Sequence, residues 1–172
     1  VLVWYWVPEE GIRRRSALDH VPYEQWAADA YIKATPGTAV DMRIVKADIL
    51  ALSKRFNIRE IAFDRWGATQ IANELNEEGL EVIPFGQGYR DLTGPTKALL
   101  EHVLGGRIDH GGNPVLRWNA DYLVVTQDPA GNIKPDKAKS TERVDGAVAL
   151  IMALGRAVAN RGSVAPSIRW MA

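Results

Sequence analysis

The chain has 172 residues, of which 47% are hydrophobic and 24% are charged, a composition that fits one folded domain with a sizeable core. Its 21 basic and 21 acidic side chains give a formal net charge of zero, which argues against DNA binding driven by bulk charge but leaves room for a local basic strip. The absence of cysteine excludes disulfides and cysteine-based zinc sites and fits a reducing cytoplasm. No apolar run approaches the ~18 residues of a membrane span, so no membrane partner is expected.

The N-terminal part is predicted to contain a strand, a loop and a helix. Residues 1–7 are β-branched and aromatic, which predicts a strand buried on both faces. Residues 9–22 are polar and include Arg13-Arg14-Arg15, which predicts a loop. Residues 23–33 carry apolar side chains at helical spacing, and the predicted helix ends before Thr35-Pro36-Gly37.

The middle of the chain predicts a parallel crossover. Asp41 is suited to cap a helix over residues 42–56. Residues 58–63 predict a strand that ends at Asp64, residues 68–78 a helix, and residues 80–85 a second strand. A strand–helix–strand unit of this length implies an α/β layer fold.

The C-terminal half is predicted to end in a buried helix. The expected elements are a helix from Thr93 or Gly94 to residue 104, a short helix at 113–120, a strand at 123–126, a turn at 128–132 and a return strand from Ile133. The last element is a nearly all-apolar helix over residues 143–159, which should lie against the sheet. We therefore expect one domain over residues 1–160 and a flexible tail over residues 161–172.

Two aspartates occupy positions where chemistry is expected. Asp64 lies at the carboxyl end of a parallel strand, the edge at which α/β sheets place their sites, or it caps the following helix. Asp145 lies in the first turn of the last helix, where it either complements the helix dipole or faces the sheet between Val144 and Val148. A carboxylate that faces the sheet requires a paired cation or a metal.

Together the two aspartates favour a metal site. Hard divalent cations such as Mg²⁺ bind carboxylate oxygens, water and substrate phosphate. Two such ions about 4 Å apart can activate a water and stabilise the leaving oxygen in phosphodiester cleavage. Many α/β proteins contain such a pair of aspartates, so the spacing alone has low specificity.

Basic residues precede Asp145 in the sequence. The strip consists of Lys134, Lys137, Lys139 and Arg143. It predicts either a phosphate-contacting flap or a solvated, lysine-rich hairpin. Arg13-Arg14-Arg15 is a weaker candidate of the same kind, and His110 either contacts phosphate or metal or has a structural role in a turn.

An ordered set of short motifs resembles the large terminase subunit of HK97-like tailed phages. The motifs are Trp6-Val7-Pro8-Glu9-Glu10, Val21-Pro22-Tyr23 with Trp26, Thr35-Pro36-Gly37, Phe63-Asp64-Arg65-Trp66-Gly67-Ala68, His110-Gly111-Gly112-Asn113-Pro114-Val115-Leu116-Arg117-Trp118, Lys137-Ala138-Lys139-Ser140 and Arg143-Val144-Asp145-Gly146-Ala147-Val148-Ala149-Leu150. The resemblance extends to about residue 156. Tyr122 departs from it, because the family commonly has an asparagine there.

The resemblance implies a ribonuclease-H-like fold, a mixed central sheet flanked by helices, that cuts concatemeric double-stranded DNA with a two-metal site of Mg²⁺ or Mn²⁺. It implies an N-terminal ATPase domain in the parent protein, with the small terminase subunit and the portal as partners in the host cytoplasm. The isolated domain is expected to be a monomer.

Of the family's three acidic positions, the second resembles Asp64 and the third resembles Asp145. The first lies on a strand upstream of the segment that resembles residues 1–7. We therefore expect that strand to be missing and this chain to cleave DNA weakly or not at all. The alternatives are a catalytically dead prophage remnant that binds DNA or protein, and another ribonuclease-H-like nuclease such as a resolvase or transposase.

Overall fold

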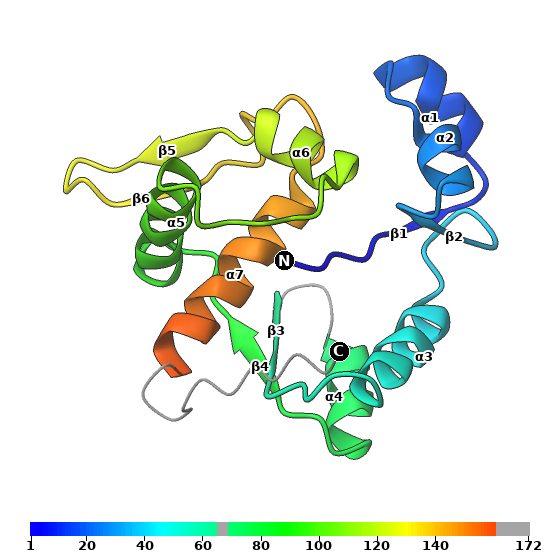
Figure 1. The fold of residues 1–172 in the computed structure, drawn as a ribbon, viewed down its shortest axis with the longest axis horizontal. Coiled ribbons are helices and arrows are strands. Elements are labelled where there is room, and N and C mark those ends of the chain that lie inside the picture. Colours follow the sequence, from blue (N-terminus) through cyan, green and yellow to red (C-terminus); the bar gives the residue numbers. More distant parts are fainter. Residues whose placement is uncertain (65–68, 161–172) are drawn as a thin grey trace.

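The computed structural model describes residues 1–64 and 69–160, which have an α/β organisation (Figure 1). The described strands form three two-stranded sheets: β1 (Trp6–Pro8) with β2 (Lys33–Thr35), β3 (Ile61–Asp64) with β4 (Val82–Phe85), and β5 (Val125–Gln127) with β6 (Ile133–Pro135). The first two pairs are parallel and the third is antiparallel. In this part of the chain, the β-structure expected as one mixed sheet is therefore divided among three short pairs.

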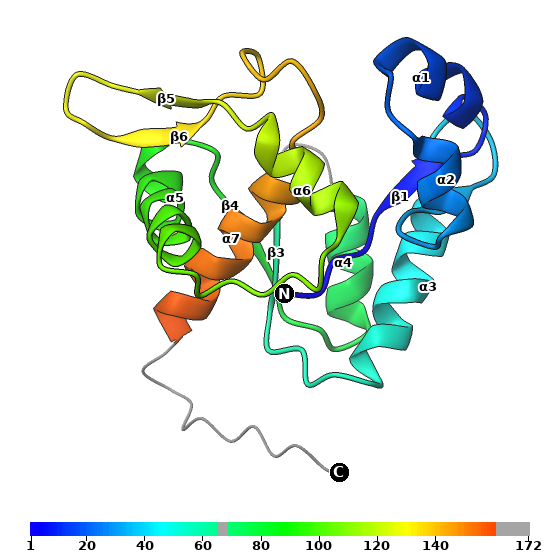
Figure 2. The same cartoon turned by 45° about the horizontal axis from the view of Figure 1, so that its top comes forward.

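Helices cover these sheets. The described helices are α1 (Ile12–Asp19), α2 (Tyr23–Ala28), α3 (Met42–Ser53), α4 (Thr69–Glu77), α5 (Tyr89–Leu104), α6 (Pro114–Asp121) and α7 (Asp145–Ala159). Figures 1 and 2 show α7 and α4 on opposite sides of the β3–β4 pair, with α5 and α6 packed on the outer side of α7. The predicted crossover is confirmed, because β3, α4 and β4 follow one another and the two strands are parallel. None of the described helices is long and apolar enough to cross a membrane.

Two hydrophobic clusters form the core. One lies where α2 meets α6 and consists of Val21, Tyr23, Trp26, Ile32 and Val115. The other lies around α7 and consists of Leu92, Val144, Val148, Ile151 and Met152. Ile151 is fully buried, which confirms the prediction that the apolar last helix is an internal element.

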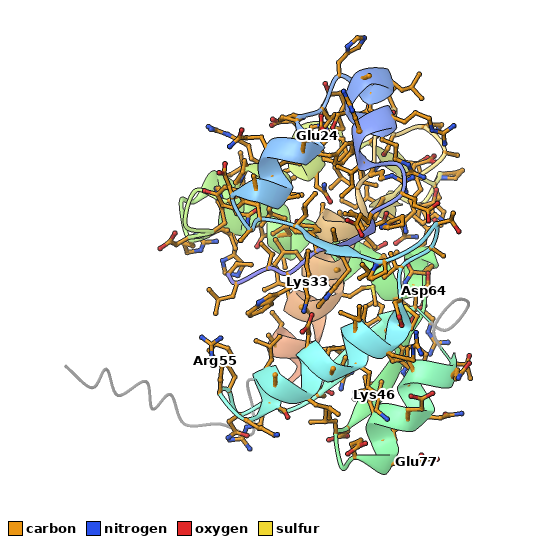
Figure 3. The ribbon with its side chains drawn as sticks, turned by 90° about the vertical axis from the view of Figure 1, so that its right-hand side faces the viewer. Glu24, Lys33, Lys46, Arg55, Asp64 and Glu77 are labelled. Atoms are coloured by element: carbon orange, nitrogen blue, oxygen red, sulfur yellow. The ribbon has the colours of Figure 1, made fainter. Side chains whose placement is uncertain are left out.

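Helix α3 joins the two parallel pairs. Asp48 accepts hydrogen bonds from the indole of Trp6 in β1 and the ammonium of Lys33 in β2, both at 2.7 Å. On the α4 side, Lys46 pairs with Glu74 and Glu78 at 3.4 and 3.3 Å. Figure 3 shows Lys33 and Lys46 near α3, between the β1–β2 pair above and α4 below. The helix thus holds the two parallel pairs at a fixed separation.

The predictions for the N-terminal part are partly wrong. Of the strand predicted over residues 1–7, only residues 6 and 7 are a strand, because β1 begins at Trp6 and ends at Pro8, and Leu2 is 65% exposed rather than buried. The predicted loop contains α1, in which the arginine run takes helical conformation because arginine is a good helix former. The helix predicted over residues 23–33 ends at Ala28. Lys33, the last residue of the predicted range, is the first residue of β2.

Other boundaries also differ from the sequence prediction: α3 ends at Ser53 rather than at residue 56, and β5 begins at Val125 rather than at residue 123. Helix α5 begins at Tyr89 rather than at residue 93 or 94, so Pro95 lies inside the helix, where its missing N–H removes one backbone hydrogen bond. Helix α7 begins at Asp145 rather than at residue 143. The predicted tail over residues 161–172 lies outside the described residues.

The Asp41 cap of α3 is confirmed and gives a pH prediction. Its carboxylate accepts the Arg43 backbone N–H at 2.9 Å, and the hydrogen bond from the Arg43 side chain is the main cause that lowers the pKa of Asp41 to about 2. A carboxyl whose folded pKa is lowered stabilises the fold above its unfolded pKa of about 4, and this stabilisation is lost as the pH falls toward 2. Asp41→Asn keeps the oxygen that caps the helix but lacks the charge. We therefore expect this variant to lose less stability than the wild type as the pH falls from about 4 to 2, measured by urea denaturation at each pH. Equal losses would contradict the role of the Asp41 charge.

Candidate functional site

Asp64 lies at the end of β3, as predicted. It pairs in register with Phe85 at the end of the parallel strand β4, so both strands point their carboxyl ends at the same edge. The Asp64 side chain lines a depression of about 330 Å³. The other lining residues are Gln87, Leu92, Lys134, Pro135, Asp136, Lys137 and Val148. Asp64 is thus placed beside the basic segment that follows β6.

Asp145 is the first residue of α7, but it does not face the sheet. Val144 and Val148 are 2% and 5% exposed and occupy the buried side, whereas the Asp145 side chain is 65% exposed. Its Oδ1 accepts a hydrogen bond of 2.6 Å from the Lys137 ammonium. Of the two interpretations of Asp145, the one in which it faces the sheet is therefore wrong, because the helix turn that buries the two valines points residue 145 outward.

Lys137 connects the two candidate acids. Its side chain lines the Asp64 depression while its ammonium binds Asp145. Lys137 thus pairs with Asp145 and lines the depression that Asp64 also lines, although the two aspartates are 81 positions apart in the sequence (145 − 64). An ion pair between half-exposed groups contributes little to stability, so another cation can replace the ammonium without loss of the fold.

A third carboxylate, that of Asp136, lines the same depression. The sequence analysis missed it, because it treated residues 134–139 as a basic segment. Its Oδ1 accepts the backbone N–H groups of Ala138 and Lys139 at 3.1 and 3.2 Å. This pattern is typical of an Asx turn, in which an aspartate bonds to backbone two residues ahead. Asp136 therefore shapes the turn that presents Lys137.

Asn119 of α6 fixes the turn that carries Asp145. The N-terminus of α7 has no side-chain cap of its own at Val144. Instead, Oδ1 of Asn119 accepts the Gly146 backbone N–H at 2.7 Å, and the Asn119 side chain is buried. A Cβ at residue 146 would overlap the Tyr5 hydroxyl, so this position requires glycine. The contact between α6 and α7 thus sets where Asp145 is displayed.

The lysines of the predicted basic strip come together, but the histidine does not join them. Lys134 lines the Asp64 depression and lies over the Tyr89 ring, with Nζ 5.2 Å from the ring centroid. Lys139 is 65% exposed and pairs with Asp136 at 3.6 Å. His110 lines neither this depression nor the hollow next to it, and its Nδ1 is buried without a hydrogen-bond partner among the described residues.

A second hollow, of about 280 Å³, lies on the other side of Asp145. Arg143 lines it together with Arg15 from α1, so the strip divides between two hollows. The remaining lining residues, apart from Asp145 and Gly146, are Tyr5, Trp6, Val7, Pro8, Ile12, Tyr23, Ile32, Val40, Val115, Trp118 and Asn119. The Lys137–Asp145 ion pair therefore joins a depression lined by aspartates and lysines to a largely apolar hollow with two arginines.

The donor chemistry fits a hard divalent cation. Asp64 and Asp145 offer carboxylate oxygens, which are the ligands that Mg²⁺ and Mn²⁺ take. Within residues 1–64 and 69–160, no group of three or more His, Cys, Asp or Glu side chains is close enough to hold one ion. Asp64 and Asp145 are the candidate ligands that the sequence predicts, and Asp136 is a further carboxylate on the Asp64 depression.

Comparisons with known proteins place the chain in one family. The family described as "Terminase large subunit, endonuclease domain" matches residues 6–161. The large terminase subunit of Enterobacteria phage HK97 is 39% identical over 160 residues, which cover 91% of this chain and 32% of that protein. Protein YmfN of Escherichia coli (strain K12) is 32% identical over 163 residues, which cover 90% of this chain and 35% of that protein.

The fold agrees with a solved structure of the same group. The crystal structure of the HK97 bacteriophage large terminase matches with a TM-score of 0.81 and 38% identity, over 88% of this chain and 32% of that one. The match confirms the predicted ribonuclease-H-like α/β fold. The chain spans about a third of the length of these relatives. On the family match over residues 6–161, the chain belongs to the endonuclease domains of phage terminase large subunits.

Proposed function

We propose that this chain is a metal-dependent endonuclease domain that cuts concatemeric double-stranded DNA, with Asp64 and Asp145 as its metal ligands. The observation that supports this most directly is the side chain of Lys137, which lines the depression beside Asp64 and pairs with Asp145. Two acids from distant elements are thereby gathered at the carboxyl edge of a parallel strand pair.

The surrounding residues are suited to the same task. Mg²⁺ or Mn²⁺, bound as a pair, would supply an activated water and stabilise the leaving oxygen in phosphodiester cleavage. Asp64 and Asp145 would hold the ions, and Lys137 would release Asp145 to a bound cation. Lys134 and Lys139 then border the site with positive charge, which attracts the DNA backbone.

Cleavage by the 172-residue chain is expected to be weak. Among the described residues, no group of three or more His, Cys, Asp or Glu side chains could hold one ion, and Mg²⁺ is held more tightly by larger sets of oxygen ligands, so the metal affinity should be low. In the parent protein, we propose that the domain acts with an ATPase domain, the small terminase subunit and the portal in the host cytoplasm. The isolated chain is proposed to be monomeric.

The test combines metal binding with cleavage. Mn²⁺ binding to the chain is measured by electron paramagnetic resonance, and nicking of supercoiled plasmid is measured with Mg²⁺, Mn²⁺ or EDTA. We expect saturable Mn²⁺ binding and slow nicking that EDTA abolishes. The HK97 large terminase serves as the assay control.

The two readouts separate the outcomes. Saturable Mn²⁺ binding without nicking, under conditions in which the control cuts, would support a non-catalytic DNA- or protein-binding module. Absence of Mn²⁺ binding by the folded chain would overturn the assignment of Asp64 and Asp145 as metal ligands.

A further inference from the structure

We propose that Arg15 and Arg143 form a phosphate-binding clamp that holds the DNA backbone in the hollow beside Asp145. The proposal rests on the proposed nuclease function and deepens it, because it names where the substrate strand lies relative to the metal ligands. Arg15 comes from α1 and Arg143 from the segment that leads into α7, so the clamp joins elements that are far apart in the sequence.

The two guanidinium groups share one hollow. Both line the 280 Å³ hollow whose edge includes Asp145. Neither side chain makes a hydrogen bond or ion pair with another residue in the described part of the chain. Asp145, which lines the same hollow, forms its ion pair with Lys137 rather than with either arginine. Two arginines that keep their donors unused at one hollow are suited to an anion, and a guanidinium binds phosphate oxygens in a bidentate manner.

A buried hydroxyl adds a donor to the same hollow. The Tyr5 hydroxyl is buried without a hydrogen-bond partner among the described residues and lies against Gly146, next to Asp145. Burial raises the pKa of Tyr5 to about 12, so the group remains a proton donor near neutral pH. A buried donor without an acceptor is unfavourable, and a bridging water would satisfy it.

Nearby acids do not cancel the site. Burial raises the pKa of Tyr23 to about 12, with further contributions from Asp19 and Glu142, whereas Arg143 lowers it. These influences place both carboxylates in the neighbourhood of the hollow, but neither of them lines it. Asp145 does line it, and a metal on Asp145 would turn that edge positive.

The geometry separates Arg15 from its neighbours on the same helix. Arg13 and Arg14 are exposed to solvent, whereas Arg15 is partly buried at the hollow. The three arginines carry the same charge within one turn of α1, so any long-range attraction to DNA is nearly equal for all of them. Only a direct contact distinguishes Arg15, which gives the experiment a matched control.

The experiment measures DNA binding without cleavage. Fluorescence anisotropy of a labelled duplex of about 30 base pairs is recorded in EDTA between about 50 and 200 mM KCl. We expect Arg15→Gln and Arg143→Gln each to weaken binding on the order of 5- to 10-fold and to reduce the slope of log K against log [KCl] by about 1. The Arg13→Gln/Arg14→Gln double variant should change affinity less than about 2-fold. Thermal unfolding of each variant confirms that the fold is retained.

The outcomes distinguish this proposal from the proposed function. If wild type binds DNA but Arg15→Gln behaves like the double control variant, the clamp is overturned and the nuclease assignment stands. If Arg143→Gln weakens DNA binding and Arg15→Gln does not, the clamp is also overturned, because Arg15 then makes no contact with the DNA. If the wild-type chain does not bind the duplex at any of these salt concentrations, the clamp is overturned, whereas the metal-dependent cutting function is decided by the separate nicking assay.

Discussion

Replacing Asp145 or Asp64 by Asn should lower Mn²⁺-dependent nicking on the order of 10²- to 10³-fold and weaken Mn²⁺ binding, while the fold remains intact. An amide has one neutral oxygen where the carboxylate has two that share a negative charge, so it is a poor ligand for a hard cation. Neither change should unfold the chain. Asp145 is 65% exposed, and its ion pair with Lys137 lies at the surface, where such pairs contribute little stability. Rates are compared by plasmid nicking, and affinities by paramagnetic resonance.

Asp136→Asn is the matched control for these two substitutions. Asp136 lines the same depression as Asp64, but its Oδ1 is engaged with the backbone of residues 138 and 139. An asparagine keeps that acceptor, so nicking should change less than about 10-fold. A loss as large as that of Asp145→Asn would identify Asp136 as a third ligand. Normal nicking by either Asp64→Asn or Asp145→Asn would remove that residue from the site.

The elements that the sequence predicts well are those defined by a strong local pattern. The crossover from β3 to β4 and the buried helix α7 follow from apolar periodicity and from turn residues at their ends. Helix α1 was missed because its sequence, IRRRSALD, has a weak amphipathic pattern and no buried residue. Strand β2 was missed because its pairing with β1 joins residues about 27 positions apart, which no local window reveals.

The candidate site shows the same division. The location of Asp64 at a strand end and of Asp145 in the first helical turn could be inferred from neighbours in the sequence. The outward orientation of Asp145 could not, because it depends on which valines the α5–α7 contact buries. The bond from Gly146 to Asn119 and the meeting of Arg15 with Arg143 depend on tertiary packing between separate elements. Sequence patterns thus found the acids but not the residues that hold them in place.

The contact between α6 and α7 leaves no room for a side chain at Gly146. We expect Gly146→Ala to lower the free energy of unfolding by about 1–3 kcal/mol, although alanine is otherwise the better helix former. Its Cβ would overlap the Tyr5 hydroxyl and come within 2.8 Å of Asn119 Oδ1, so the first turn of α7 must shift. Because that turn carries Asp145, Mn²⁺ affinity should fall as well. Urea denaturation and Mn²⁺ titration of the folded variant measure the two effects separately.

Gly94→Ala provides the comparison, because Gly94 lies within α5 and a Cβ there would meet nothing within 4 Å. It should leave Mn²⁺ affinity unchanged and raise stability by up to about 1 kcal/mol. Adding Tyr5→Phe to Gly146→Ala removes the hydroxyl that the new methyl group overlaps, so part of the lost stability should return. Full stability and normal Mn²⁺ affinity in Gly146→Ala would show that the bond to Asn119 does not fix the position of Asp145. Recovery in the double variant would instead tie the position of Asp145 to the packing of Tyr5, which precedes β1, against α7.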